Sequence, residues 1–174
     1  MNRIEVFDMD GTLLDSQRAT ITAYQQAANE LDIPLPENFW GKAASQWQCP
    51  AQLHHRKVEI YTSMLATIRP AWAWGRLCNA VRDKTMHRIW TGASFATVTT
   101  LCLNTEFAKH LWRATAGMTT EDKRTAMRRL RYAYPQHTIY YYDDNMVEAV
   151  KICVEIPNIT IITEPKGEPL PCEL

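Results

Sequence analysis

The chain has 174 residues, of which 46% are hydrophobic and 22% are charged, and its formal net charge is zero. This length accommodates one compact domain with a small insertion, and it excludes two full domains. The composition excludes a disordered or fibrous protein, and the balanced charge indicates no particular partner.

The five cysteines are widely spaced and form no CxxC pair, so neither a zinc site nor a disulfide framework is expected. Acidic residues at Glu5, Asp8 and Asp10 break any signal-peptide pattern. Reduced cysteines are typical of a cytoplasmic protein, which is the predicted location. No apolar run approaches the roughly 20 residues that a membrane-spanning helix needs, so no membrane association is expected.

The first predicted elements are a strand and a helix. Residues 4–9 form a short apolar run that Gly11 bounds, which indicates a buried parallel strand. From Ser16 to Leu31 apolar residues recur at helical spacing, so an amphipathic helix is predicted there. Pro34 and Pro36 end it.

Residues 38–84 are predicted to form a mainly helical insertion, with helical stretches at 52–68 and 74–82. Between Ala51 and Trp90 there are seven basic and two acidic residues. This basic segment can face an anionic substrate, or it can be an ordinary solvated helix surface. Both readings stay open.

The rest of the chain alternates strands and helices. A second strand is predicted at residues 87–90, and a further one is expected between Thr91 and Thr120. The other predicted elements are helices at 107–115 and 120–132 (the latter capped by Thr120), a strand at 137–142, a helix at 146–154, a strand at 159–163 and an extended tail from Glu164. This alternation predicts an α/β fold with a parallel sheet and helices on its faces.

Polar residues follow three of the predicted strands. Asp8 and Asp10 come at the end of the first, Thr91 follows the second, and Asp143 and Asp144 follow a late one. In an open parallel sheet, ligands bind outside the carboxyl ends of the strands. These side chains are therefore expected to converge there if the strands are neighbours.

The residue types suit phosphate chemistry. Asp8 and Asp10 are two residues apart, so on a regular strand their side chains point the same way. One carboxylate can attack phosphorus, and the other can protonate the leaving oxygen and later activate water. A magnesium ion would relieve the repulsion between the carboxylates, and Asp143 and Asp144 are suited to supply further ligands.

The same residues resemble a known family. Residues 7–16 (FDMDGTLLDS) are similar to the first motif of the haloacid dehalogenase superfamily. Thr91-Gly92 resembles its second motif, Lys123 the lysine of its third, and Asp143-Asp144 its fourth. The resemblance implies a Rossmann-like parallel sheet with helices on both faces, formed by residues 1–15 and 85–174. Residues 16–84 would then be a small helical cap.

By this resemblance Asp8 is the nucleophile and Asp10 the general acid and base. Thr91, Gly92 and Lys123 would bind the phosphate. Asp8 and Asp143 would bind Mg²⁺ through their side chains and Asp10 through its carbonyl, with Asp144 nearby. The implied activity is that of a magnesium-dependent phosphatase working through an aspartyl-phosphate.

The basic and aromatic insertion favours a nucleotide or a nucleic-acid end as the substrate, because bases stack on aromatic rings and phosphates meet arginines. Leu130, Tyr134-Pro135 and the run that ends in Asp143-Asp144 also resemble the phosphatase modules of polynucleotide kinase-phosphatases. That branch usually carries arginines where Ala93 and Asn145 stand in this chain. The alternatives are a sugar or other metabolite phosphate, and a binding protein without turnover.

Overall fold

The computed structural model describes residues 2–37, 39 and 47–164. Within these residues four parallel strands form one sheet in the order β2-β1-β3-β4. The strands are β1 (Arg3–Phe7), β2 (Met86–Ile89), β3 (Thr138–Tyr142) and β4 (Ile159–Ile162). The helices are α1 (Gln17–Leu31), α2 (Ala51–Ser63), η3 (Leu65–Thr67), α3 (Trp74–Arg82), α4 (Phe95–Asn104), α5 (Ala108–Leu111), α6 (Thr120–Ala133) and α7 (Met146–Cys153).

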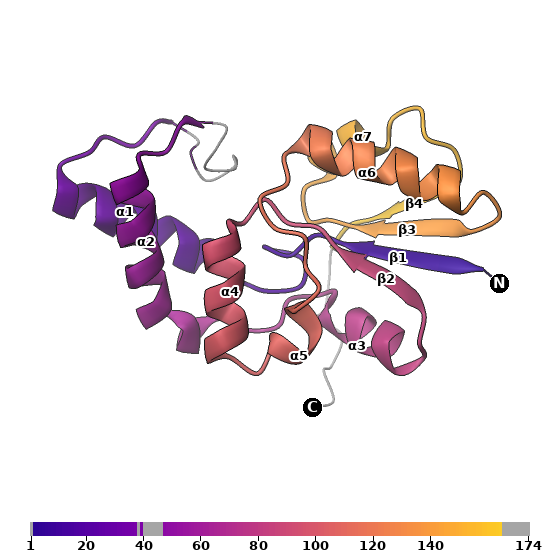
Figure 1. Ribbon diagram of the computed structural model, residues 1–174, viewed down its shortest axis with the longest axis horizontal. Coiled ribbons are helices and arrows are strands. Elements are labelled where there is room, and N and C mark those ends of the chain that lie inside the picture. The colour runs from indigo at the N-terminus through magenta and orange to yellow at the C-terminus, as the bar shows by residue number, and fades with distance from the viewer. Residues whose placement is uncertain (1, 38, 40–46, 165–174) are drawn as a thin grey trace.

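Helices cover both faces of the sheet, as predicted (Figure 1). Along β1, Ile4 and Val6 pack into the same core cluster as Met127 of α6 and Ile152 of α7. Phe7 points to the opposite face and belongs to a second cluster. This alternation is the two-residue period of a strand that is buried on both sides. The predicted α/β fold with a parallel sheet is confirmed.

Helix α3 lies on the second face, where it contacts β2 and α5. A partly buried ion pair joins it to β1: Arg76 Nη2 is 2.6 Å from Oε1 of Glu5, a residue with no exposed surface. A buried carboxylate needs such a partner, because an unpaired charge in the interior is costly. The C-terminal part of the predicted insertion, residues 74–82, therefore lies against the sheet.

Two adjacent segments lead into and out of the rest of the insertion. The amide of Asp15 donates to the carbonyl of Arg69 at 2.9 Å, and the amide of Ala71 donates to the carbonyl of Leu13, also at 2.9 Å. The chain thus leaves the sheet after β1 and returns beside its own point of exit. Between these points α1 packs against α2, and α2 also packs against α4, which follows β2 in the chain.

The three helices α1, α2 and α4 form a group beyond the carboxyl ends of the strands (Figure 1). Because Phe7 pairs in register with both Ile89 and Tyr142, the residues that follow these strands come together at one edge, facing this group. None of the helices in the described ranges is both long enough and apolar enough to cross a membrane.

The region between β2 and β3 differs from the prediction. The strand expected between Thr91 and Thr120 is absent among the described residues: helices α4 and α5 fill this stretch, and Thr115 makes only an isolated bridge to Trp90. The helix predicted at 107–115 is reduced to the single turn of α5. The cap of α6 is Thr119 and not Thr120, because the Thr119 hydroxyl accepts from the amide of Asp122 at 3.1 Å. Most of the predicted extended tail lies outside the described residues.

Candidate active site

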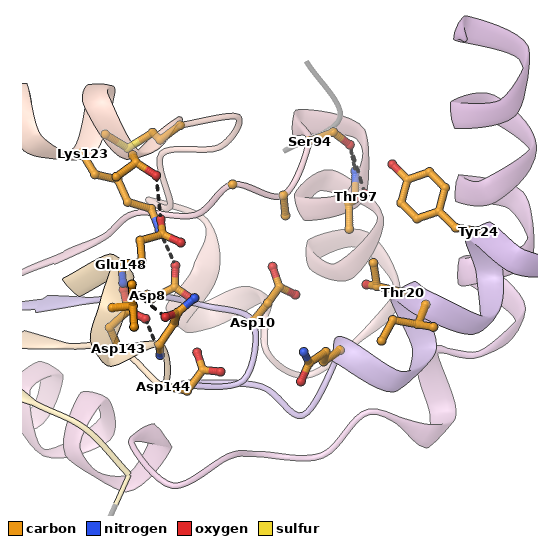
Figure 2. Close-up of a pocket in the computed structure, with 18 of the residues that line it drawn as sticks. Asp8, Asp10, Thr20, Tyr24, Ser94, Thr97, Lys123, Asp143, Asp144 and Glu148 are labelled. Atoms are coloured by element: carbon orange, nitrogen blue, oxygen red, sulfur yellow. Dashed lines mark hydrogen bonds and ion pairs between the residues drawn. The ribbon is translucent and has the colours of Figure 1, made fainter. Parts of the chain in front are cut away.

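A cavity of about 480 Å³ lies at the carboxyl ends of β1 and β3. Figure 2 shows Asp8, Asp143, Asp144, Lys123 and Glu148 gathered on one side of it, with Asp10 between them and the helical group. Tyr24 and Thr20 of α1 and Ser94 and Thr97 at the start of α4 line the opposite side. The cavity therefore lies between the sheet edge and the helices that face it.

Asp8 is the first residue after β1, and its amide continues the sheet by donating to the carbonyl of Tyr142 at 2.8 Å. Only 8% of the residue is exposed. Lys123 Nζ donates to Asp8 Oδ1 at 2.7 Å and lies 3.3 Å from Oε1 of Glu148. Lys123 reaches this position because it falls on the buried stripe of α6, one helical turn before Met127. The predicted nucleophile and the predicted third-motif lysine are thus in direct contact.

The two aspartates after β3 are fixed differently. Asp143 is buried, and its carboxylate accepts from the Tyr141 hydroxyl at 2.7 Å and from the Asn145 amide at 2.8 Å. Asp144 forms hydrogen bonds with Thr12 of the first motif. Its amide donates to Oγ1 of Thr12 at 2.9 Å, and its Oδ1 lies 3.2 Å from the same oxygen. Thr12 therefore ties the loop after β1 to the loop after β3.

Asp8, Asp143 and Asp144 each offer one carboxylate oxygen, and these three oxygens lie within 4.8 Å of one another. Burial raises the pKa of Asp8 and that of Asp143, the latter to about 6, although the Lys123 ammonium opposes both shifts; partial desolvation also raises the pKa of Asp144, which is more exposed. A divalent cation among them would favour the ionised forms and relieve their mutual repulsion. Hard carboxylate oxygens at this spacing suit Mg²⁺, so the donor set fits the predicted metal.

The side chain of Asp10 is held apart from those three carboxylates. Its Oδ1 accepts from the buried hydroxyl of Ser16, and Thr91 Oγ1 donates to its Oδ2 at 3.2 Å. Ser16 Oγ also lies 3.4 Å from the carbonyl oxygen of Leu14. Because the serine hydroxyl has a second acceptor within reach, it can donate to ionised Asp10 or accept from protonated Asp10.

The second predicted motif lies beside Asp10. Thr91 is fully buried, and its hydroxyl also accepts from the amide of Ala93 at 2.9 Å. Gly92 and Ala93 line the cavity together with Ser94, the N-cap of α4. The structure thus places every predicted site residue at this end of the sheet: Asp8, Asp10, Thr91, Gly92, Lys123, Asp143 and Asp144. Binding of phosphate by Thr91, Gly92 and Lys123, and of metal by the Asp10 carbonyl, stay predictions.

The sequence matches no family model and no curated protein. Solved structures are similar in fold at low sequence identity. A hydrolase from Pseudomonas syringae is 17% identical, with a TM-score of 0.66 over 91% of this chain and 82% of that one. CbbY from Rhodobacter sphaeroides, in complex with xylulose-(1,5)bisphosphate, is 16% identical, with a TM-score of 0.68 over 96% and 88%. A subfamily IA hydrolase of the HAD superfamily from Geobacter sulfurreducens is 13% identical, with a TM-score of 0.60 over 94% and 89%.

The fold is that of the haloacid dehalogenases. The resemblance in the motifs is thereby confirmed at the level of the fold, which in this chain carries the Asp8–Lys123 pair and the three-carboxylate cluster at its usual ligand-binding edge.

Among the residues of this site that were not predicted, three are central to its arrangement. Glu148 lies beside Lys123, Ser16 bonds Asp10, and Lys57 of α2 lines the cavity. Two of them carried a signal in the sequence: Ser16 ends the run of residues 7–16 that resembles the first motif, and Lys57 lies within a helical pattern. It falls on the apolar stripe of its helix, one turn after Leu53 and one before Tyr61, both of which are buried.

Gly11 is expected to be essential for the geometry of the carboxylate cluster. Its φ is +82°, and a Cβ on it would lie 2.5 Å from Oδ2 of Asp144. We expect Gly11→Ala to lower the free energy of unfolding by about 1–3 kcal/mol, from the strained backbone and the clash, and to weaken magnesium binding by displacing Asp144. Chemical denaturation and calorimetric Mg²⁺ titration would measure both effects.

Gly117→Ala is the matched control. Gly117 also has a positive φ, +70°, but a Cβ there would meet nothing within 4 Å. It should lose about 1 kcal/mol of stability from backbone strain alone and keep its affinity for Mg²⁺. Equal loss of magnesium affinity in both variants would contradict the role assigned to the Gly11–Asp144 contact.

Proposed function

We propose that this protein is a magnesium-dependent phosphatase that forms an aspartyl-phosphate on Asp8. The observation that supports it is the convergence at one sheet edge of a lysine-paired carboxylate, two further metal-ligand carboxylates and a separately held Asp10. A site that only bound phosphate would not need a second carboxylate held ready for proton transfer.

In the first step, an Asp8 carboxylate oxygen attacks phosphorus, and the bond from phosphorus to the ester oxygen breaks. Asp10, in its protonated form, gives its proton to the leaving oxygen, so the alcohol leaves as a neutral molecule. The Lys123 ammonium, 2.7 Å from Asp8 Oδ1, offsets negative charge beside the nucleophile. Bound Mg²⁺ would neutralise charge on the phosphoryl oxygens.

In the second step, Asp10 is a carboxylate and takes a proton from a water molecule that attacks the aspartyl-phosphate. The bond between phosphorus and Asp8 breaks, so inorganic phosphate leaves and both aspartates return to their starting forms. The hydroxyls of Ser16 and Thr91 hold Asp10 in place through both steps, since Ser16 can turn its hydroxyl to the Leu14 carbonyl and accept when Asp10 is protonated, while Thr91 still donates to the other oxygen.

We also propose that residues 1–15 and 85–174 form the core domain and that residues 16–84 form an inserted segment. The part of this insertion that faces the cavity consists of α1 and α2, which contribute Tyr24 and Lys57 to its lining. Closure of α1 and α2 over the site would exclude water and select the substrate.

For the substrate we propose a phosphorylated small molecule, with a sugar or other metabolite phosphate favoured over a nucleic-acid end. The arginines of the basic segment are partly neutralised, because Arg56 pairs with Glu30 at 2.5 Å and Arg76 pairs with Glu5 at 2.6 Å. Tyr24 is the one Phe, Tyr or Trp side chain in the cavity lining formed by the described residues, and only the imidazole of His54 adds a second aromatic ring, so a stacking platform for several bases is not evident there.

Phosphate release from an aryl phosphate, sugar phosphates, nucleoside monophosphates and a 3′-phosphorylated oligonucleotide would test the proposal. Each substrate would be incubated with Mg²⁺ and with a chelator. Magnesium-dependent release supports a phosphatase, and the preferred substrate separates a metabolite from a nucleotide. If well-folded protein that binds magnesium released phosphate from none of them, the result would favour a binding protein without turnover.

Magnesium is also expected to stabilise the fold. At a concentration of about 100 times its Kd, a ligand of the native state adds about 2.7 kcal/mol, which for a chain of this size raises Tm by about 5–10 °C. Thermal unfolding with and without Mg²⁺ would measure this. Asp143→Asn should lose most of the shift, whereas Glu121→Gln, a change on the exposed face of α6, should keep it. An equal shift in both variants would place the metal elsewhere.

A further inference from the structure

Lys57 is a buried cation on the side of the cavity away from Asp8. It lies on α2, only 3% of the residue is exposed, and it lines the same cavity as the carboxylate cluster. Lysine is almost never this buried unless it has a charged partner. The mechanism proposed above does not use it.

Among residues 2–37, 39 and 47–164, none forms an ion pair with this ammonium group. Lys57 Nζ donates to Thr97 Oγ1 at 3.2 Å, and it lies 4.5 Å from the ring centroid of Tyr61 and 5.3 Å from that of Tyr24. An ammonium group has three N–H donors, and one hydroxyl satisfies only one of them. Aromatic faces attract a cation but do not neutralise it.

The carboxylate that attracts Lys57 most strongly in the described part of the chain is already engaged. The negative charge of Asp10 acts on Lys57, but the two residues form no ion pair, and the Asp10 carboxylate is bonded to Ser16 and Thr91. Burial lowers the pKa of Lys57 to about 8 despite this attraction. A buried cation that gains so little from its own protein is suited to an anion that arrives with the ligand.

We propose that Lys57 binds a second anionic group of the substrate, a carboxylate or a second phosphate, separate from the phosphate that is hydrolysed. This inference rests on the proposed phosphatase function and specifies its substrate class. Tyr24 on α1 and Thr97 on α4 both lie beside the Lys57 ammonium, and Figure 2 shows these two side chains across the cavity from Asp8. Lys57 is then a specificity residue, and it takes no part in the transfer of the phosphoryl group.

Matched substrate pairs separate this role from a structural one. 3-Phosphoglycerate and glycerol 3-phosphate differ by a carboxylate, and fructose 1,6-bisphosphate and fructose 6-phosphate differ by a phosphate. In each pair, the doubly anionic member is the one that carries two anionic groups. We expect the wild-type protein to prefer this member of at least one pair by about 10–100-fold in kcat/KM, the range for a hydrogen bond to a charged group. The preferred pair identifies the anion.

Lys57→Met keeps the length of the side chain and removes its charge. It should abolish the preference, mainly through KM of the doubly anionic member, and leave the singly anionic member within about threefold. Lys109→Met, on the exposed surface of α5, is the control for loss of one positive charge and should keep the preference. Equal losses for both members of each pair in Lys57→Met would overturn the proposal.

The pH dependence of the wild-type protein gives a test that needs no variant. The titratable groups around the ammonium are Asp10 in the loop after β1, Tyr24 on α1, Cys49 just before α2, and His54 and Tyr61 on α2. Because Lys57 loses its proton as the pH rises through about 8, the preference for the doubly anionic member should fall above that pH. A preference that stays constant from pH 7 to about 10 would contradict the subsite.

Binding to the Asp8→Asn variant separates this inference from the phosphatase proposal. Calorimetry with each substrate pair, with and without Lys57→Met, measures the subsite without turnover. Selective binding of the doubly anionic member that depends on Lys57, together with a wild-type protein that hydrolyses neither member, would support the subsite and contradict the phosphatase. Turnover without any such selectivity would contradict the subsite and leave the phosphatase intact.

Discussion

Asp8→Asn is expected to lower kcat/KM for every phosphate ester by about 10⁴-fold or more. The amide nitrogen that replaces one oxygen carries no nucleophilic lone pair, so the aspartyl-phosphate cannot form, and loss of a nucleophile typically costs on the order of 10⁴–10⁶ in rate. Steady-state phosphate release, together with a search for covalently bound phosphate by intact-protein mass measurement, would establish the effect.

The matched control lies in the same motif. Asp15 is exposed, and Asp15→Asn should change the rate by no more than about two- to threefold, as surface substitutions do. Asp8→Asn replaces a side chain of the same shape, so its secondary structure should stay unchanged by circular dichroism. If the variant kept more than about a hundredth of the activity with the same metal dependence, Asp8 would not be the nucleophile.

The strands that carry the site were predictable because they are short apolar runs that end abruptly in polar residues. β1 ends before Asp8 and β3 before Asp143, and both strands have side chains packed into the core on two faces. Side chains that follow parallel neighbours must meet at one edge, so the convergence of the aspartates followed from the strand order. Lys123 was predicted as a site residue because it lies at the start of the helix before β3. In the structure it lies on the buried face of α6 and contacts Asp8.

Helix α4 was not predicted because its sequence does not favour a helix. Phe95–Asn104 contains three threonines and a valine, whose branched side chains lose freedom in a helix. Packing against α2 and the Ser94 cap compensate. The strand expected in the same region was an inference from alternation alone, and only the Trp90–Thr115 bridge occupies that place.

The role of Lys57 could not be predicted because it depends on two other elements. The spacing Leu53, Lys57, Tyr61 puts the lysine on the buried face of α2, but the sequence does not indicate that α1 brings Tyr24 and α4 brings Thr97 to that face. The count of basic residues in the same segment suggested a charged surface. In the structure Arg56 and Arg76 form ion pairs, and the lysine that faces the cavity is one residue among seven.

Asp10→Asn is expected to lower activity in a way that depends on the leaving group. For an alkyl phosphate, whose alkoxide needs a proton to leave, the loss should be about 10²–10⁴-fold, the usual contribution of a general acid. For an aryl phosphate the phenolate leaves without help, so the first step should remain fast. The second step still needs Asp10 to activate water, and the aspartyl-phosphate should therefore accumulate.

Rapid mixing of Asp10→Asn with an aryl phosphate should thus give a burst of phenol equal to the amount of protein, followed by slow turnover, whereas an alkyl phosphate should give no burst. Ser16→Ala and Thr91→Val, which remove the two hydroxyls that hold Asp10, should show a weaker form of the same pattern. An equal loss for both esters without a burst would mean that Asp10 acts on neither proton transfer. The carboxylate would then only hold the loop between β1 and α1, and the proton donor would have to be sought among the other groups of the cavity.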